Sequence, residues 1–467
     1  MARPFFTAVA VLAASLAVLL AAFGFRNESE DRVVTDYVRG KNNTVLFLTN
    51  SEYGLSNVHV ATAQSLLENH PHVRVHFASF PRMSGRIARV SSLARLQNAS
   101  APNITFHELK GQSYAAAVEE KAGFVNLSSR WFEHWPGLSA YPRMGTIIQG
   151  LVAPWGRDAY LALLGSDMPF PVPWSRIPEN IYLASRFIYS VYIASQRRSS
   201  TSLPRKHGEP RTSQARDGKE IFIAPHIPGS TLPLNAISKS TIGTNSIVLR
   251  SAAAAQQDPE LANWLKRAPT LLVNLGSIYK YTEESASIMA QAIQVVLGQT
   301  KVSGTSLVQV LWKHSPDYEY GNDFSASLEG YIAEDRVRIS SWLPIDTMAM
   351  LETGRIVASV HHGGANSYHE ALSGGVPHVV VPMWVDLYNY AMLAELTGVG
   401  IYATRGTAPH WSVEGLSKAF LGVVNGPKSA SMREKAQHIA QLMRKEPGSH
   451  QAAKAIAELA AQGLVPP

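Results

Sequence analysis

The chain contains no cysteine among its 467 residues. Disulfide bonds, cysteine-ligated zinc, iron–sulfur clusters and thiol nucleophiles are therefore all excluded. Charged residues are also sparse, at 16% of the chain against 46% hydrophobic residues. This ratio excludes a mainly disordered chain, and at ~150 residues per domain the length predicts two to three folded domains. Any chemistry of this protein must use oxygen and nitrogen groups.

Positive charge is not spread over the chain but comes mostly from one segment. Residues 197–219 hold seven basic and two acidic residues, and the formal charge of the whole chain is +7. The segment is rich in serine, proline and glycine, so it is predicted to be an exposed, solvated loop. Contact of this loop with anionic lipid headgroups is the lesser alternative. Because the charge is local, no nucleic-acid partner is predicted.

One long uncharged run is present near the N-terminus, at residues 5–25. At ~1.5 Å per residue, a helix of this length spans the ~30 Å hydrocarbon core of a bilayer. The run exceeds the usual ~7–15-residue core of a cleaved signal peptide, so residues 1–26 are predicted to be a signal anchor, with a cleaved signal peptide as the alternative. Both interpretations imply the secretory pathway, and we expect a single-pass protein of the endoplasmic reticulum membrane.

The orientation of this anchor stays open on the sequence. One basic residue precedes the run and four soon follow it, which weakly favours a cytosolic body. Five N-glycosylation acceptors favour a lumenal body and hence a glycoprotein. These acceptors are Asn27, Asn42, Asn98, Asn103 and Asn126.

Alternating strand and helix patterns predict an α/β protein. A β-branched run at 44–49, a helical pattern at 58–70 and a second apolar run at 73–77 indicate a βαβ unit with a parallel sheet. Further on, strands alternate with helices over ~180 residues, which is typical of a doubly wound domain that binds ligands at the carboxyl ends of its strands. The predicted strands of this second series are 271–275, 307–312, 337–339, 356–360 and 379–381, with a helix at 283–297.

The most informative segment follows the predicted strand that ends at Val360. A tight turn at Gly363 and Gly364 leads into a helix that is expected to start near Asn366. Glycines at such a junction let the backbone approach a ligand, while free N–H groups and the helix dipole attract anions. The geometry suits a phosphate or diphosphate, to which His362 can add a donor.

Two residues of the predicted helix admit two interpretations. Glu370 lies one turn after Asn366 and can accept hydrogen bonds from ribose hydroxyls. Ser367 and Glu370 also have the spacing of a capping box, in which Glu370 reaches back to a backbone N–H. His361 and His362, taken alone, are ordinary histidines at a strand end.

The whole segment resembles the signature of the UDP-dependent glycosyltransferases, the family of plant and animal UDP-glucosyl- and glucuronosyltransferases. That signature runs H-x-G-x-N-S-x-x-E, then G-V-P, then P-x-W-x-D-Q. Trp342-Leu-Pro resembles the W-x-P that opens it, and Asn274-Leu-Gly276-Ser277 resembles a strand-end F-G-S. The doubled histidine and the Asp-Leu-Tyr ending are most similar to fungal members. The residues at the family's spacing are His362, Gly364, Asn366, Ser367, Glu370, Gly375, Val376, Pro377, Pro382 and Asp386.

This resemblance implies the GT-B fold, in which two Rossmann-like domains face each other across a cleft. It implies an N-terminal acceptor-binding domain at 43–255 and a C-terminal UDP-sugar-binding domain at 266–450. It also implies that no cofactor and no metal is needed, since the UDP-sugar is the donor substrate. The chain has no Asp-x-Asp motif that would hold a metal.

By the same resemblance, Trp342 holds the uracil, Glu370 the ribose and Asp386 the sugar hydroxyls. The glutamine that follows in the family is Leu387 here, which leaves the identity of the sugar open. The residues that the resemblance assigns to the diphosphate are Gly276, Ser277, His362, Gly364, Asn366 and Ser367.

The candidates for the catalytic base lie in the N-terminal half of the chain. In the family a histidine after the first strand, oriented by an aspartate, deprotonates the acceptor hydroxyl. Here Ser56 falls at that position and His59 one turn later, so His59 is the predicted base, with Glu52 as a second candidate. A plain helix histidine is an equally open interpretation of His59.

The unit that carries the family's aspartate is not found. Only residues 165–168 separate two segments that the family joins by a strand and helix, and Asp158 at the edge matches no family motif. The function predicted is inverting transfer of a hexosyl group from a UDP-sugar to a hydroxyl of a small hydrophobic acceptor. The alternatives are a catalytically impaired UDP-sugar-binding protein and, less well matched, a UDP-sugar epimerase.

Overall fold

The structure is a computed structural model, and it describes residues 43–110, 174–178, 221–231, 241–302, 308–383, 387–405, 407–408 and 410–462. Nearly all of these residues belong to one compact unit, which joins residues 38–134 to residues 222–467.

Four features predicted from the sequence lie outside the described residues: the anchor at 5–25, the shortened segment at 165–168 with Asp158, the basic loop at 197–219 and Asp386. Among the residues that the structure does describe, no helix has the length and apolar character to cross a bilayer.

The N-terminal part of this unit is a small parallel sheet with helices. Its elements are β1 (Thr44–Leu48), α2 (Tyr53–Asn69), β2 (Arg74–Ser79), the 3-10 turn η1 (Pro81–Met83), α3 (Ser84–Gln97) and β3 (Thr105–Glu108). The strands pair in parallel in the order β1-β2-β3, which confirms the predicted βαβ unit. Helix α2 begins five residues before the predicted start, because its first turn buries the polar side chains Ser56 and Asn57 and so lacks an apolar pattern.

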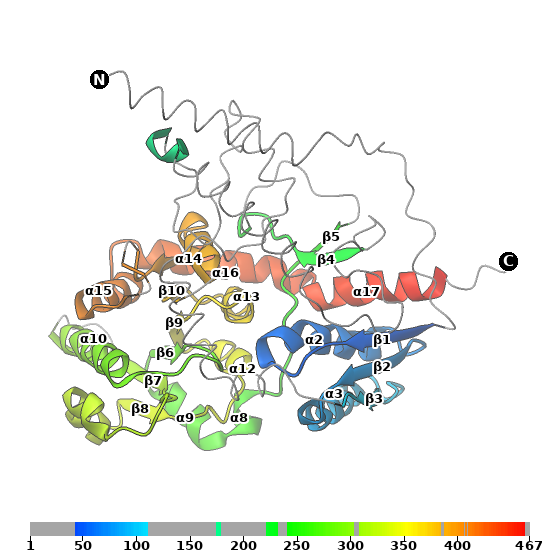
Figure 1. Cartoon of the computed structure of the whole chain (residues 1–467), viewed down its shortest axis with the longest axis horizontal. Coiled ribbons are helices and arrows are strands. Elements are labelled where there is room, and N and C mark those ends of the chain that lie inside the picture. Colours follow the sequence, from blue (N-terminus) through cyan, green and yellow to red (C-terminus); the bar gives the residue numbers. More distant parts are fainter. Residues whose placement is uncertain are drawn as a thin grey trace, which may run out of the picture. The chain divides into compact units, whose positions relative to one another are not determined.

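The C-terminal part contains a parallel sheet of six strands in the order β11-β10-β9-β6-β7-β8 (Figure 1). The order reverses between β6 and β9, and parallel α/β sheets bind ligands at such a switch point. The predicted doubly wound sheet is therefore confirmed, with β11 as a strand that the sequence pattern did not show. The strands are β6 (Thr270–Asn274), β7 (Gln309–Lys313), β8 (Val337–Ser340), β9 (Ile356–His361), β10 (His378–Val380) and β11 (Gly400–Tyr402).

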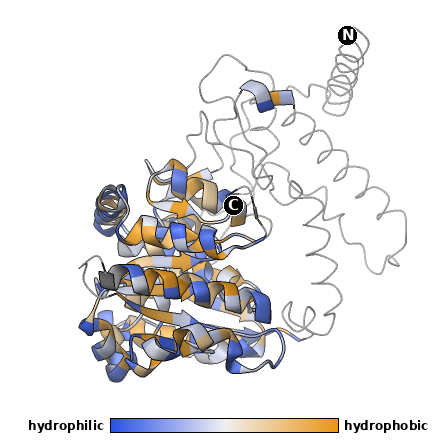
Figure 2. Cartoon of the chain, turned by 90° about the vertical axis from the view of Figure 1, so that its left-hand side faces the viewer, coloured by the Kyte–Doolittle hydropathy of each residue, from blue (hydrophilic) through white to orange (hydrophobic). Residues whose placement is uncertain are grey.

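Helices cover both faces of this sheet. Buried residues of α10 and α15 form one apolar core with the strands, and residues of α9 and α12 form a second core on other strand residues. Figure 2 shows the resulting mixture of hydrophilic and hydrophobic residues along the helices. The helices are α8 (Ala254–Gln257), α9 (Pro259–Arg267), α10 (Glu283–Val302), α11 (Glu329–Ala333), α12 (Thr347–Leu351), α13 (Ala365–Gly374), α14 (Leu387–Leu396), α15 (Val413–Val424), α16 (Ser429–Lys445) and α17 (Gly448–Ala461). Shorter elements are η2 (Trp174–Arg176), η3 (Asn322–Leu328) and the parallel pair β4 (Phe222–Pro225) and β5 (Thr241–Thr244).

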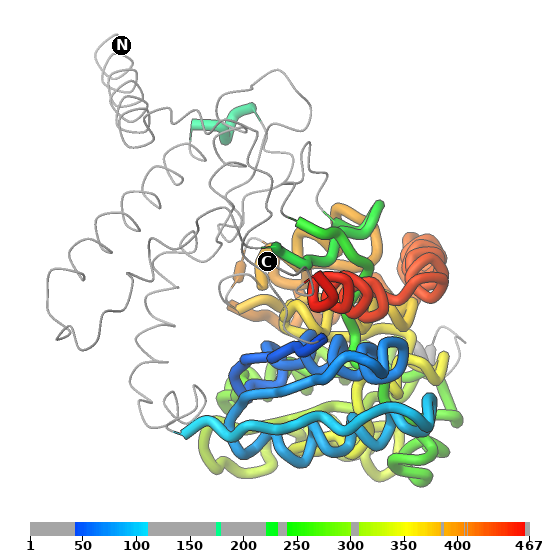
Figure 3. Tube along the Cα trace, turned by 90° about the vertical axis from the view of Figure 1, so that its right-hand side faces the viewer, coloured from blue at the N-terminus to red at the C-terminus, as the bar shows by residue number. Residues whose placement is uncertain are grey.

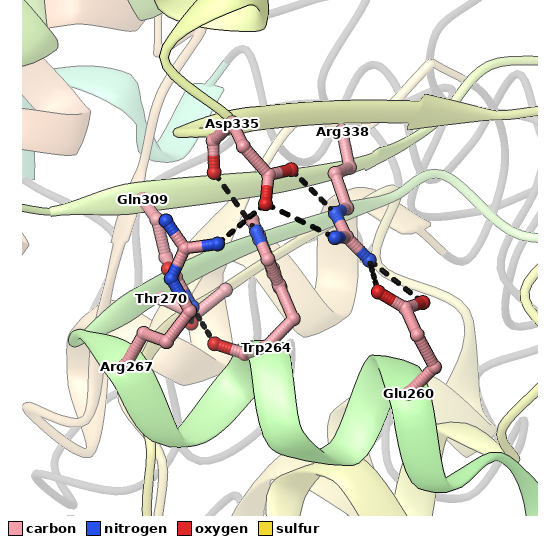
Figure 4. A network of polar contacts seen from close by, with 7 residues as sticks. All are labelled: Glu260, Trp264, Arg267, Thr270, Gln309, Asp335 and Arg338. Atoms are coloured by element: carbon pink, nitrogen blue, oxygen red, sulfur yellow. Dashed lines mark hydrogen bonds and ion pairs between the residues drawn. The ribbon is translucent and has the colours of Figure 1, made fainter.

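A polar network fixes α9 to the strands of the sheet (Figure 4). The buried Trp264 donates from Nε1 to the carbonyl oxygen of Asp335 at 2.9 Å. Arg338 pairs with Asp335 and with Glu260, each at 2.8 Å. Gln309 donates to the carbonyl oxygen of Trp264 at 3.0 Å, so the helix is tied to β7 as well as to the start of β8.

The last helix, α17, packs against the N-terminal part of the unit (Figure 3). Its Ala453 and Ala457 belong to the apolar core that β1, α2, β2 and α3 form. At its start, Gln451 Oε1 accepts from the backbone N–H of Asn245 at 2.6 Å. The helix therefore joins segments that lie far apart in the sequence.

Candidate active site

Two glycine turns lie at the carboxyl ends of neighbouring strands. Gly276 follows β6 with a φ of +86°, and Gly363 follows β9 with a φ of +92°. Only glycine adopts such backbone angles without strain. Strands β6 and β9 pair in parallel, so the two turns meet at the same edge of the sheet, at its switch point.

The ring of His362 fills the space between these turns. A Cβ atom on Gly276 would lie 2.6 Å from His362 Cε1, and one on Gly364 would lie 2.5 Å from His362 Nε2. Both positions therefore exclude any side chain while His362 keeps this place. Burial, with a further contribution from Lys313, lowers the pKa of His362 to about 4. The imidazole is neutral at physiological pH and can act as a hydrogen-bonding group but not as a cation.

Helix α13 begins directly after the second turn. Its N-cap is Gly364, which has no side chain, so the N-terminal N–H groups of the helix have no side-chain acceptor there. The capping-box interpretation of Ser367 and Glu370 is therefore wrong, because both residues lie inside the helix. Asn366 and Ser367 are half-buried in the first turn, beside N–H groups that suit an anion.

Trp342 presents an indole ring that is largely uncovered, with 53% of the residue exposed. The ammonium of Lys313 lies 4.2 Å from the ring centroid, and Tyr53 lies edge-on at 6.4 Å. An exposed ring that is held in place from two sides is suited to stacking a planar base.

Lys313 is a candidate site residue that sequence reasoning missed. It ends β7, is only 6% exposed and donates from Nζ to the carbonyl oxygen of Gly276 at 2.8 Å. Burial, aided by Lys280, lowers its pKa to about 8. Within the described residues it forms no ion pair with a carboxylate. A lysine at the end of an apolar strand, next to a predicted ligand edge, was the available signal.

Glu370 projects from α13 one turn after Asn366 and is half-buried. Burial, with a further contribution from Asp346, raises its pKa to about 7, and Arg86 acts in the opposite direction. The carboxyl therefore changes its charge near neutral pH, where it can accept from a hydroxyl as a carboxylate.

The N-terminal candidates occupy α2 and the residue before it. His59 is half-buried and meets the ring of Phe47 edge-on at 6.2 Å, and burial lowers its pKa. Glu52 is buried at the N-cap position of α2 and makes no cap hydrogen bond. None of these contacts reaches the glycine turns, so the role of either residue as base stays a prediction.

At the family's base position the structure shows an unexpected pair. Ser56 is fully buried and accepts a hydrogen bond from Nη1 of Arg86 at 3.1 Å. The guanidinium of Arg86 also lies 4.0 Å from the ring centroid of Tyr53, and burial lowers its pKa. No local sequence pattern connects α2 with Arg86, which lies on α3.

The structure thus gathers Gly276, His362, Gly364, Lys313 and Trp342 around one edge of the sheet. Ser277 is exposed beside Gly276, and Asn366, Ser367 and Glu370 follow on α13. Asp386 lies outside the described residues. No group of three or more histidine, aspartate or glutamate side chains that could hold a metal occurs in the described ranges.

Comparisons with known proteins agree with this geometry. A family of domains, Erythromycin biosynthesis protein CIII-like, C-terminal domain, matches residues 328–459. The glycosyltransferase sdnJ of Sordaria araneosa is 28% identical over 79% of this chain and 85% of its own length. The 2-hydroxyacylsphingosine 1-beta-galactosyltransferase of Homo sapiens is 26% identical over 48% of this chain and 36% of its own length.

Solved structures show the same fold. Os79 of O. sativa, in complex with U2F and trichothecene, has a TM-score of 0.54 at 14% identity and covers 90% of this chain and 100% of its own. A UDP-glucosyltransferase of Polygonum tinctorium has a TM-score of 0.51 at 15% identity, with 90% and 99% covered. The predicted GT-B arrangement of α/β domains is confirmed by this likeness. The chain is thus similar to UDP-dependent glycosyltransferases in sequence and in fold, and it is an enzyme of the hexosyltransferase type.

Proposed function

We propose that this chain transfers a hexosyl group from a UDP-sugar to a hydroxyl of a small hydrophobic acceptor, with inversion at the anomeric carbon. The observation that carries the proposal is the placement of Lys313, His362 and the exposed ring of Trp342 around two side-chain-free turns. This arrangement offers a stacking surface for a base and donors for a diphosphate at one edge of the sheet.

In the proposed reaction the acceptor oxygen attacks the anomeric carbon while the bond from that carbon to the UDP oxygen breaks. The negative charge that develops on UDP is stabilised by the ammonium of Lys313 and by the free N–H groups at the start of α13. The proton of the acceptor passes to a base, for which His59 is the candidate. A single displacement of this kind inverts the anomeric centre, and it requires neither a metal nor a cofactor.

Support for the acceptor class comes from the relatives. The human relative is named for 2-hydroxyacylsphingosine, and the rice structure holds a trichothecene. Leu387 stands where the family has a glutamine, so the sugar is proposed only as a hexose, with glucose as the first to test. The division into an acceptor domain at 43–255 and a donor domain at 266–450 also stays a prediction.

The donor site is tested by titrating UDP. Removing the stacking ring in Trp342→Ala is expected to weaken binding by about 5- to 150-fold, the effect of about 1–3 kcal/mol of base stacking. Trp174→Ala is the matched control, since it removes another exposed indole, which is 72% exposed. Equal affinity of Trp342→Ala and the native chain would remove the uracil assignment.

Catalysis is tested with labelled UDP-glucose and a panel of hydroxyl acceptors. We expect a β-linked product from the α-linked donor, observed by NMR, and at least a hundredfold lower kcat in His59→Ala, since general-base catalysis contributes about 10²–10⁴-fold. An α-linked product contradicts inversion, and unchanged turnover excludes His59 as base. UDP binding without transfer to any acceptor would instead favour the impaired binding protein, which the similarity to sdnJ along 85% of its length does not favour.

Location and metal independence are further parts of the proposal. A single-pass protein of the endoplasmic reticulum with a lumenal body should shift its mobility after endoglycosidase treatment and stay in the membrane pellet at alkaline pH. Turnover should be unchanged by EDTA. An unshifted band contradicts the lumenal orientation, and loss of activity in EDTA contradicts the metal-free mechanism.

A further inference from the structure

His361 and His378 form a buried pair beneath the turn that leads into α13. They lie on the paired strands β9 and β10, where His361 is in register with Val380 and His378 with Ser359. Only 1% of His361 and 0% of His378 is exposed. The Nε2 atom of His361 lies 2.9 Å from the Nδ1 atom of His378.

The hydrogen bonds of the pair fix where its protons lie. The backbone N–H of Gly363 donates to His361 Nδ1 at 3.1 Å, and a backbone N–H can only donate. His361 therefore carries its proton on Nε2 and donates it to Nδ1 of His378. His378 must then carry its own proton on Nε2. Burial lowers the pKa of both rings, that of His378 to about 3, so the pair is neutral at physiological pH.

This placement of the protons leaves one buried N–H group without an acceptor among the described residues. The Nε2 atom of His378 is buried and makes no hydrogen bond within the described part of the chain. The ring stacks on Tyr368 at 4.9 Å between centroids, which holds it without satisfying that N–H. A buried donor without an acceptor is unfavourable, so a pair of apolar side chains would suit folding alone better.

The acceptor at His361 Nδ1 controls the shape of the turn. Gly363 is also closely packed, since a Cβ atom there would lie 2.7 Å from the carbonyl oxygen of Leu387 and 3.0 Å from Val380 Cγ1. With its N–H directed to His361, Gly363 turns the chain into α13, whose first N–H groups meet no side-chain acceptor at the N-cap. The same turn sets the ring of His362 between the two glycines.

We propose that the neutral pair of His361 and His378 holds the Gly363 turn in the shape that binds the diphosphate of the donor, which makes His361 a positioning residue. The inference rests on the proposed function, because it assigns this role to the predicted UDP-sugar site. His361 contacts no ligand in it and acts through the backbone.

The test compares UDP with uridine, which lacks the phosphates. His361→Leu removes the acceptor for Gly363 and is expected to weaken UDP binding about tenfold, while uridine binding stays the same. His361→Asn should restore most of the lost affinity, because an asparagine side chain accepts from the N–H two residues on, as in an Asx turn. His369→Leu is the control, since His369 is a half-buried histidine whose Nδ1 lies 2.8 Å from Ser246 Oγ and so bonds elsewhere than at the Gly363 turn.

The outcomes separate the inference from the function. If the native chain binds no UDP, the proposed function fails. If it binds UDP and His361→Leu binds UDP equally well, or loses UDP and uridine in parallel, only the positioning role is overturned. Should His361→Leu fail to fold, His378→Phe keeps the ring stack and removes the partner, and the same selective loss of UDP affinity is expected.

The positions of the protons on the two rings can also be measured directly. In the full chain labelled with ¹⁵N-histidine, NMR should show both rings as Nε2–H tautomers at pH 7. A proton on Nδ1 of either ring would overturn the proposal.

Discussion

Glu370 lies where a carboxylate is useful for binding but unfavourable for folding. Burial and the nearby Asp346 raise its pKa to about 7, above the ordinary range. Ionisation is therefore penalised in the folded state, and the penalty grows as the pH rises from about 4 and is fully present above about 7. Glu370→Gln is expected to raise the free energy of unfolding at pH 8 by on the order of 3 kcal/mol and to leave it unchanged at pH 4. Urea unfolding at both pH values measures this.

The same substitution should weaken UDP binding, because an amide accepts a ribose hydroxyl less strongly than a carboxylate does. We expect about a five- to tenfold loss for UDP at pH 8 and little loss for 2′,3′-dideoxy-UDP. A variant that is neither more stable at pH 8 nor selective for the ribose would contradict both assignments.

Lys313 is a buried cation at the same site, whereas Glu370 is a half-buried carboxyl group. Burial lowers its pKa to about 8, so the ammonium is present at pH 7 and is lost as the pH rises through about 8. If this charge holds the diphosphate, UDP binding to the native chain should weaken between pH 7 and pH 9. Lys313→Met should lower UDP affinity about tenfold or more at pH 7 and remove this pH dependence.

Lys313→Arg is the control for the charge, because its guanidinium stays protonated and should keep UDP affinity at pH 9. Lys313→Met should also unfold at a higher urea concentration at pH 7, since a buried charge is removed. Native-like UDP affinity of Lys313→Met at pH 7 would exclude the lysine from the donor site.

At the level of residues, sequence reasoning found the groups that share one local motif. His362, Gly364, Asn366 and Glu370 follow one another over a single turn and helix, and the structure shows the turn and helix that the motif predicts. Lys313 was missed because its contact with Gly276 joins β7 to the end of β6, and strand order is not a local property.

Among the elements, α9 and the start of β8 are held by the network of Figure 4. Hydrogen bonds from Arg338, and then from Arg267, hold the pKa of Asp335 below its ordinary value. The depressed pKa contributes stability above the unfolded-state pKa, and this stability is lost as the pH falls through the folded-state value. Because the carboxylate is exposed, Asp335→Asn should lower the free energy of unfolding at pH 7 by no more than about 1 kcal/mol and by less at pH 3.

Urea unfolding at the two pH values checks this, with Asp323→Asn as a control on an exposed aspartate outside the network. An equal loss at both pH values would show that the pairing of Asp335 does not depend on its charge.

Strands and helices with clear periodicity were predicted to within a few residues, as for β6, β9 and α10. The three residues of β11 and the first turn of α2 were not, since the former is too short for a pattern and the latter buries Ser56 and Asn57. Contacts between elements that lie far apart in the sequence, such as those of α17 with α2, were not predicted either, because they depend on packing that no single segment encodes.

In the molecule as a whole, α17 connects the C-terminal sheet to the N-terminal core. Its apolar face of Ala453 and Ala457 packs with the core of β1, α2 and β2. Asn245, in the segment between the two parts, donates to Gln451 and also to the carbonyl oxygen of Glu446 at 2.8 Å. This junction leaves no room for a side chain at Gly448, the first residue of the helix.

The close approach at Gly448 gives a test of the junction. A Cβ atom there would lie 2.0 Å from the carbonyl oxygen of Asn245, so Gly448→Ala must force the segment and the helix apart. We expect a loss of about 1–3 kcal/mol in the free energy of unfolding, as for overpacking in a core. Gly330→Ala is the matched control, because Gly330 lies inside α11 with no atom within 4 Å of its added Cβ. That substitution should be neutral or stabilising by up to about 1 kcal/mol. If both variants unfold at the native urea midpoint, the junction accepts the added methyl group without loss of stability. In that case α17 does not couple the two parts.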